Sequence, residues 1–223
     1  MTTLRSKISV EFHSHTLASR DSLTRPAELV AAARRRGIDR VVVTDHNSIA
    51  GARQAHRLDP GRIIVGEEIM TTRGEILAAY VTEEVPAGLS PVEAIRRLRG
   101  QGAFISVSHP FDRLRKGGWA LADLMEIVPL VDAIEAFNSR CMSKRFNIEA
   151  GEFARRNGIP VTVGSDAHAA FELGRALLLV EPFEGPDEMR KVLPGGVPRV
   201  KMSPIWVHLV SRYASMRKGK NRS

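Results

Sequence analysis

The chain has 223 residues, 43% of them hydrophobic, which is enough to form the core of one α/β domain of ordinary size. Cys141 is the only cysteine and no apolar run is long, so we expect no intrachain disulfide, no signal peptide and no membrane span, and a reducing, cytoplasmic location. The net charge is +8, but residues 189–223 hold nine Lys or Arg and no Asp or Glu, so the basic character belongs to this segment and does not indicate nucleic-acid binding by the whole protein.

Short β-branched runs alternate with longer helical segments along the chain. We expect strands at residues 8–13, 40–45, 62–71, 75–82, 103–108, 131–137, 160–165 and 175–181. Helices are expected over 26–37, which has Pro in its first turn, after a capping box from Ser90 to Glu93, and in a segment that ends at Gly158. This alternation with short connections indicates parallel strands, in either a barrel or a doubly wound sheet.

Residues 62–82 interrupt the alternation, because two strand-like runs are joined there by TTRG. This pattern predicts a hairpin or a strand excursion beside the other strands. There is no internal repeat and no low-complexity linker. We therefore expect one barrel domain over residues 1–200, followed by an amphipathic helix and a basic tail over 201–223.

The C-terminal helix is expected to open at Ser203 and Pro204. One of its faces is apolar and carries Ile205, Leu209, Tyr213 and Met216. We expect this face to dock on the outer surface of the barrel, far from the strand ends, which would make the helix dispensable for chemistry. A contact between its cations and nucleic acid is the sharper alternative.

Histidines and carboxylates follow at least five of the expected strands. The segments EFHSHT, VVVTDH, IIVGEE, FISVSHP and VTVGSDAH contain His13, His15, Asp45, His46, Glu67, Glu68, His109, Asp166 and His168. The carboxyl ends of parallel barrel strands meet at one end of the fold, so most of these side chains should converge. Imidazole nitrogen together with carboxylate oxygen suits zinc, manganese or iron.

In their order, the motifs H-x-H, T-D-H, G-x-E, S-H-P and G-S-D-A-H resemble those of the PHP (polymerase and histidinol phosphatase) family of metal-dependent phosphoesterases. The resemblance spans about residues 8–181. It implies a distorted (β/α)7 TIM-like barrel, two or three divalent ions (Mn, Zn or Fe) at the carboxyl ends of the strands, and hydrolysis of phosphate esters.

The resemblance also implies three sets of metal ligands. They are His13, His15, Glu68 and Asp166 for the first ion, Glu68, Glu75 and His109 for the second, and Asp21, His46 and His168 for the third. Glu75 stands where the family usually has histidine, and the position of Asp21 varies between His and Asp. The added carboxylates favour harder ions such as manganese.

A phosphate substrate also agrees with the charge of this set. The four ligand carboxylates carry −4, so three divalent ions would leave the centre at about +2 and attractive to a phosphate dianion. Arg20, Arg113 and Arg140 lie in or beside the motif loops and are candidates for holding phosphate oxygens. The expected nucleophile is a hydroxide that bridges the first two ions, with Glu68 shared between them.

Several neighbouring residues have open roles at this stage. Asp45 could bind metal, but we favour its orienting an imidazole. The leaving group would take its proton from a metal-bound water, from Asp45 or from Asp112. Glu67 should point to the opposite face of its strand from Glu68. Asn138 either reaches the site or closes a turn.

The expected substrate is a phosphorylated small molecule or a short oligonucleotide. Two other functions stay open: an exonuclease or oligonucleotide phosphodiesterase with the basic tail as an electrostatic tether, and a non-catalytic metal-binding module. Metal-dependent hydrolysis of a carbon–nitrogen bond is a weaker alternative. The complete set of ligand residues argues against the non-catalytic module.

Overall fold

The computed structural model describes residues 7–220, which contain nine strands and seven α-helices. The strands are β1 (Ile8–Glu11), β2 (Arg40–Val43), β3 (Ile63–Met70), β4 (Glu75–Ala79), β5 (Phe104–Val107), β6 (Ala133–Asn138), β7 (Val161–Gly164), β8 (Ala176–Val180) and β9 (Val197–Val200). The helices are α1 (Pro26–Arg35), α2 (Ala50–Leu58), α3 (Pro91–Gly100), α4 (Leu121–Ile127), α5 (Lys144–Asn157), α6 (Gly185–Val192) and α7 (Val207–Lys220), and short 3-10 turns follow α4 and α6. Within residues 7–220, no helix is long and apolar enough to cross a membrane.

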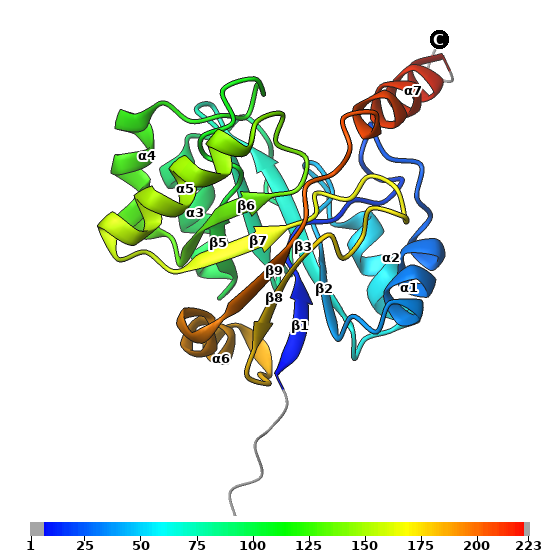
Figure 1. Cartoon of the computed structure of the whole chain (residues 1–223), viewed down its shortest axis with the longest axis horizontal. Helices are drawn as coiled ribbons and strands as arrows, with labels where there is room; N and C mark the ends of the chain where they lie inside the picture. The colour runs from blue at the N-terminus through cyan, green and yellow to red at the C-terminus, as the bar shows by residue number, and fades with distance from the viewer. Residues whose placement is uncertain (1–6, 221–223) are drawn as a thin grey trace, which may run out of the picture.

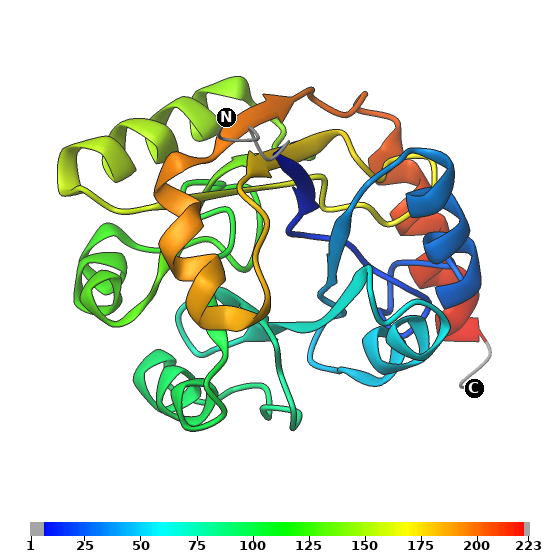
Figure 2. The same cartoon turned by 90° about the horizontal axis from the view of Figure 1, so that it is seen from below.

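The strands form one curved sheet in the order β7-β6-β5-β4-β3-β2-β1-β8-β9. Strands β1 to β3 are parallel, as are β5 to β7, whereas β4 is antiparallel to both of its neighbours and β8 is antiparallel to β1. Ser14, just after β1, pairs with Ala167, just after β7, so the sheet almost closes on itself. Helices surround this ring of strands (Figures 1 and 2). The predicted distorted TIM-like barrel is confirmed.

Each of the eight runs expected to be strands coincides with one, although β6 extends one residue beyond its expected end, and the hairpin expected at residues 62–82 is the antiparallel pair β3–β4. The capping box expected at the start of α3 is half present: the Ser90 side chain accepts a hydrogen bond from the Glu93 backbone N–H (3.3 Å), whereas the Glu93 carboxylate accepts from Arg96 and Arg97. Strand β9 was not predicted. Its sequence, VPRV, contains proline and is exposed along its length, as suits the edge of a sheet.

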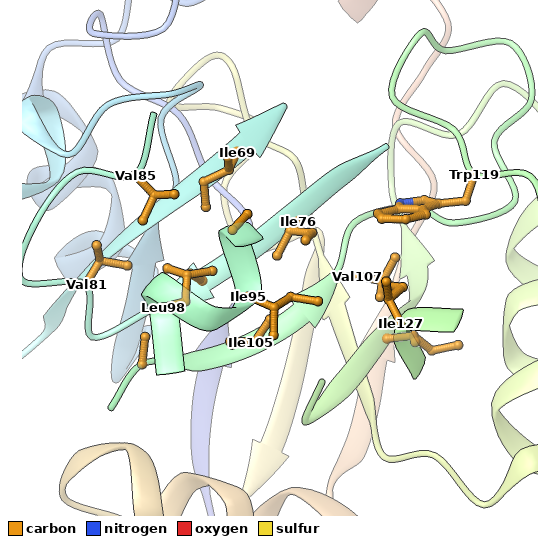
Figure 3. Close-up of a cluster of buried hydrophobic side chains, with 14 of the residues drawn as sticks. Ile69, Ile76, Val81, Val85, Ile95, Leu98, Ile105, Val107, Trp119 and Ile127 are labelled. Atoms are coloured by element: carbon orange, nitrogen blue, oxygen red, sulfur yellow. The ribbon is translucent and has the colours of Figure 1, made fainter. Parts of the chain in front are cut away.

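One large part of the core lies between α3 and the antiparallel strands. Ile95 and Leu98 of α3 pack against Ile76 of β4 and Ile105 of β5, as Figure 3 shows. These side chains are almost fully buried. They fix β4 against the barrel, and β4 begins with Glu75, one of the expected ligands.

The C-terminal helix differs from its prediction in both its start and its orientation. It begins at Val207, and the expected docking face points outward: Ile205, Leu209, Tyr213 and Met216 are 59–69% exposed. The small residues Val207 and Ala214 are buried instead. Figure 1 places α7 beyond the carboxyl ends of the parallel strands, so the expectation that it lies far from these ends was wrong.

Candidate metal centre

All nine expected ligands come together at the carboxyl ends of the strands. They are His13 and His15 after β1, Asp21 in the following loop, His46 after β2, Glu68 on β3, Glu75 on β4, His109 after β5, and Asp166 and His168 after β7. Seven of them are buried, whereas His46 and Asp21 are about a quarter to a third exposed. The open side of the cluster is therefore the side of His46 and Asp21.

The first group combines two imidazoles with two carboxylates. His13 Nε2 lies 3.2 Å from Glu68 Oε2 and 3.6 Å from Asp166 Oδ1, and His15 Nε2 lies 3.5 Å and 3.2 Å from the same two oxygens. Two ligands of one ion, each about 2.1 Å from it, lie roughly 3.0–3.4 Å apart. The spacing of these four atoms therefore suits a single divalent ion.

The second group faces both oxygens of Glu68. His109 Nε2 lies 3.4 Å from Glu68 Oε1 and 3.3 Å from Glu75 Oε2. His46 Nδ1 lies 3.1 Å from Glu68 Oε2 and 3.7 Å from Glu75 Oε1. Glu68 is thus the one carboxylate that faces both groups, as the sequence suggested.

The third group lies toward solvent. His168 Nε2 is 3.0 Å from Asp21 Oδ2, and His46 Nε2 is 3.6 Å from Asp21 Oδ1. His15, His46 and His168 also offer nitrogens within 4.8 Å of one another, so His15 lies between the first and third groups. The three expected ligand sets therefore form one continuous cluster.

In three of the histidines, the Nδ1 atom makes a buried hydrogen bond. His13 Nδ1 lies 2.9 Å from Glu135 Oε1, His15 Nδ1 lies 3.0 Å from Ser19 Oγ, and His168 Nδ1 lies 2.8 Å from a backbone carbonyl. These bonds turn the three Nε2 atoms into the cluster, as is usual for histidines that bind metals.

Glu135 was missed in the sequence. It lies on β6 and is buried, and besides its contact with His13 it accepts hydrogen bonds from His109 N (2.8 Å) and Asn138 Nδ2 (3.1 Å). A glutamate inside an apolar strand segment, AIEAFN, was the available signal. Asn138 takes both of its open roles: its Nδ2 lies 3.2 Å from Asp166 Oδ2 at the site, and its Oδ1 accepts a hydrogen bond from the Arg140 backbone N–H (2.9 Å) in the turn after β6.

Two glycines and two strained residues make room for this cluster. A Cβ atom on Gly164 would lie 2.3 Å from Glu135 Oε1, and one on Gly117 would overlap Glu75 Oε2. His109 and Asp166 have positive φ angles of 22° and 52°, which are uncommon for residues other than glycine. Such strain is typical of functional positions, and here it occurs where the chain leaves β5 and β7.

Asp45 does not touch the clustered imidazoles. Its two oxygens accept four hydrogen bonds from Thr16 and Ser19, at 2.6–3.2 Å, and it is fully buried. The Ser19 hydroxyl in turn contacts His15 Nδ1 and accepts a hydrogen bond from the backbone N–H of His46 (3.0 Å). This geometry fits the positioning of His15 and His46 through Ser19.

The expected arginines are divided between the site and the surface. Arg113 is exposed and pairs with Glu149 of α5 (2.8 Å). Arg140 is buried and donates to α7, and Arg20 lines a pocket beside His46. The guanidinium at the cluster is that of Arg115, which pairs with Asp166 (2.5 Å).

Arg115 also pairs with Asp112 Oδ2 (3.1 Å), which ties Asp112 to the cluster but occupies its carboxylate. Burial opposes the charge of Arg115, yet the carboxylate of Asp166 outweighs it and keeps the pKa above its usual value. Arg115 was missed because Arg113, two residues earlier in the same loop, is indistinguishable from it by residue type.

The charges in the cluster require cations. Burial opposes protonation of His13, but the carboxylates of Glu68, Glu135 and Asp166 raise its pKa well above the usual value. Burial and the neighbouring His168 and His46 lower the pKa of His15 to about 3. A divalent ion among the carboxylates would take the place of such protons, since metal ligands bind as neutral imidazole and carboxylate.

Four inward-facing atoms support the same conclusion. His15 Nε2, His109 Nε2, Asp21 Oδ1 and Asp166 Oδ1 are buried and have no hydrogen-bond partner in the described chain. Buried polar atoms are nearly always paired, so atoms of this kind that face one another indicate a ligand. The residues therefore fit divalent metal ions.

A pocket of about 630 Å³ adjoins the cluster on its open side. Its lining includes Leu17, Ala18 and Arg20 of the loop after β1, His46 of the cluster, and Lys218 of α7. Its volume lies in the range of small-molecule sites.

Comparisons with known proteins agree with this fold and site. A family model described as PHP-associated matches residues 144–196. An uncharacterised protein of Methanocaldococcus jannaschii is 34% identical over 187 residues, covering 82% of this chain and 75% of its own. A protein of Caldicellulosiruptor bescii named a probable phosphatase is 27% identical over 222 residues, covering 82% of this chain and 90% of its own.

Among solved structures, a two-domain protein of Bacteroides vulgatus that contains a predicted PHP-like metal-dependent phosphoesterase superposes with a TM-score of 0.71 and 18% identity. The match covers 88% of this chain and 65% of that protein, and at this identity it supports the fold alone. The relative at 34% identity, the family-model match and the ordered ligand motifs lead to the same assignment. The chain belongs to the PHP (polymerase and histidinol phosphatase) family.

Proposed function

We propose that this protein hydrolyses phosphate esters with two or three divalent metal ions, which the nine clustered residues hold. The observation that carries the proposal is the sharing of Glu68 between two groups of imidazole and carboxylate atoms spaced like the ligands of single ions. A purely structural metal site is closed by its ligands, whereas this cluster opens into a pocket.

The proposed ions are manganese, zinc or iron, and the four ligand carboxylates favour manganese. When bound, such ions activate water at neutral pH and neutralise charge on the phosphoryl oxygens. His13, His15, Glu68 and Asp166 would hold one ion, Glu68, Glu75 and His109 a second, and Asp21, His46 and His168 a third.

The chain's own residues then bind and orient the ester. Arg20, on the pocket wall, and Arg115, beside Asp166, are the guanidiniums placed to contact phosphate oxygens. The occupied carboxylates of Asp45 and Asp112 leave them unsuited to protonate the leaving group. We assign that proton to water in the pocket.

The test is a metal analysis of the purified protein joined to a substrate screen. We expect two or three Mn, Zn or Fe per chain, and metal-dependent release of phosphate or alcohol from phosphomonoesters or phosphodiesters. Inorganic phosphate should compete. Full metal loading without hydrolysis of any ester and without competition by phosphate would contradict the proposal.

A second candidate is a phosphodiesterase or nuclease that acts on short oligonucleotides. The position of α7 favours it, because Arg212 and Arg217 of this helix are exposed at the same end of the barrel as the cluster. Binding of an oligonucleotide would then weaken steeply with salt, since cations that contact phosphates release counterions. A salt titration of KM for an oligonucleotide and for a small phosphate ester separates the two candidates.

A further inference from the structure

The loop between β1 and α1 carries two of the proposed functional residues, Arg20 and Asp21. Asp21 reaches His46 and His168, and Arg20 faces the pocket. The inner side of the loop is fixed by Asp45, through Thr16 and Ser19. Its outer side is fixed by a residue nearly two hundred positions later in the chain.

Lys218, in the last turn of α7, donates three hydrogen bonds to this loop. Its Nζ lies 2.6 Å from each of the backbone carbonyl oxygens of Leu17, Ser19 and Ser22. An ammonium group has three donors, and hydrogen bonds from a charged donor are stronger than neutral ones. The three accepting carbonyls flank Arg20 and Asp21, so Lys218 closes the loop around both residues.

The other end of α7 is anchored to the barrel by a buried arginine. Arg140, 3% exposed, donates to the Val207 carbonyl (3.1 Å) and to Ser211 Oγ (2.7 Å). Just before the helix, the Ser203 N–H donates to the Ser139 carbonyl (2.7 Å). The helix is therefore held at its start by the β6 end of the barrel and near its finish by the β1 loop.

The last turn of α7 also borders the pocket, because Lys218 and Gly219 line it together with His46 and Arg20. Just before the helix, the ring of Trp206 packs against Phe171, with 5.4 Å between the ring centroids. Helix α7 therefore lies next to the site and is not a peripheral addition.

We infer that Lys218 is a positioning residue for the site: it holds the loop of residues 17–22 so that Asp21 meets His46 and His168, and it makes α7 one wall of the pocket that receives the organic part of a phosphate ester. This inference rests on the proposed function for the role of Asp21 as a metal ligand. The clamp itself rests only on the three hydrogen bonds and the anchored helix.

The test compares Lys218→Met with Arg212→Met in the full-length protein. Both changes remove one cation from α7, but Arg212 is exposed and makes none of the loop contacts of Lys218. In Lys218→Met, backbone amides of residues 17–22 should exchange hydrogen at least tenfold faster, with or without added Mn²⁺. Arg212→Met should exchange like the wild type, and Lys218→Arg should restore part of the protection.

The second measurement is Mn²⁺ binding in the absence of substrate. Removing a residue that orients a ligand typically costs about ten- to a hundredfold in metal affinity, and we expect a loss of this size for the weakest-bound ion in Lys218→Met. KM should rise more than kcat falls, with an unchanged melting temperature for the core. Wild-type exchange in residues 17–22 of Lys218→Met would overturn the clamp, whatever the enzyme hydrolyses. An equal loss of exchange protection in Arg212→Met would overturn it as well.

Discussion

Glu68→Gln is expected to reduce hydrolysis of a phosphate ester by about a thousandfold or more. Glu68 Oε2 faces the nitrogens of His13, His15 and His46, and Oε1 faces His109, so the substitution removes a charge from two groups at once. Metal ions supply several kcal/mol of transition-state stabilisation, and the substitution would weaken two of them at once. A thousandfold loss of activity corresponds to about 4 kcal/mol of that stabilisation.

The adjacent Glu67→Gln provides a matched control on the same strand. Glu67 is also buried, but it points away from the cluster and accepts a hydrogen bond from the Val85 N–H (3.0 Å), as the alternation along the strand predicted. Glutamine can accept the same bond. Glu67→Gln should therefore keep activity within a few-fold of the wild type.

The effect of Glu67→Gln on thermal stability should depend on pH. Burial raises the pKa of Glu67 to about 7, so its protonated form is favoured in the folded protein. The contribution of Glu67 to the free energy of unfolding is fully present below the ordinary carboxyl pKa and is lost as the pH rises through 7. The melting temperature of Glu67→Gln should therefore rise relative to that of the wild type as the pH increases from about 5 to about 8.

The assay is kcat/KM with saturating Mn²⁺, together with metal content and thermal unfolding of each variant. Activity of Glu68→Gln within tenfold of the wild type, with metals bound, would refute the sharing of Glu68 between ions. Equal losses of activity in both variants would show that the loss comes from disturbance of strand β3 and not from removal of a metal ligand.

Three further changes test the surroundings of the cluster. Asp45→Asn should lower kcat/KM ten- to a hundredfold, because asparagine cannot accept all the hydrogen bonds that fix the loop beneath His15; a larger loss with metals still bound would make Asp45 a candidate acid. Gly164→Ala should destabilise the fold by about 1–3 kcal/mol and weaken metal binding, since the new Cβ would lie 2.4 Å from His13 Cβ; a wild-type melting temperature would disprove this. Ser90→Ala should cost about 1 kcal/mol in denaturant unfolding with activity unchanged, because only the cap of α3 is lost.

The strands and the convergence of the candidate ligands could be predicted because both depend on local patterns. An apolar run followed at once by His, Asp or Glu identifies a strand and its functional end in the same few residues, as VTVGSDAH does. The barrel then brings the strand ends together without further information. Glu75 was predictable only by resemblance, since it lies at the start of its strand and β4 runs antiparallel to its neighbours.

The residues that support the ligands could not be predicted in the same way. The contacts of Glu135 with His13, of Arg115 with Asp166 and of Lys218 with Leu17 join residues that are 51 to 201 positions apart in the chain. Helix α7 shows the same limit. The face with the larger apolar side chains suggested docking, but the face that is buried carries Val207 and Ala214. The contacts of Arg140 and Lys218 at the two ends of the helix fix which face turns inward.

The ligand cluster and the pocket are built on different parts of the fold. Most ligands leave the ends of buried strands, where backbone and side chains are over-determined by hydrogen bonds such as those of Glu135. The pocket, by contrast, is bounded by the loop of residues 17–22 and by α7, which depend on each other through Lys218. Changes in the C-terminal helix that keep Lys218 should therefore alter which ester fits while the geometry of the buried residues at the strand ends persists. Such a division, with a constant centre at the strand ends and variable loops above it, is how barrel enzymes support many substrates on one fold.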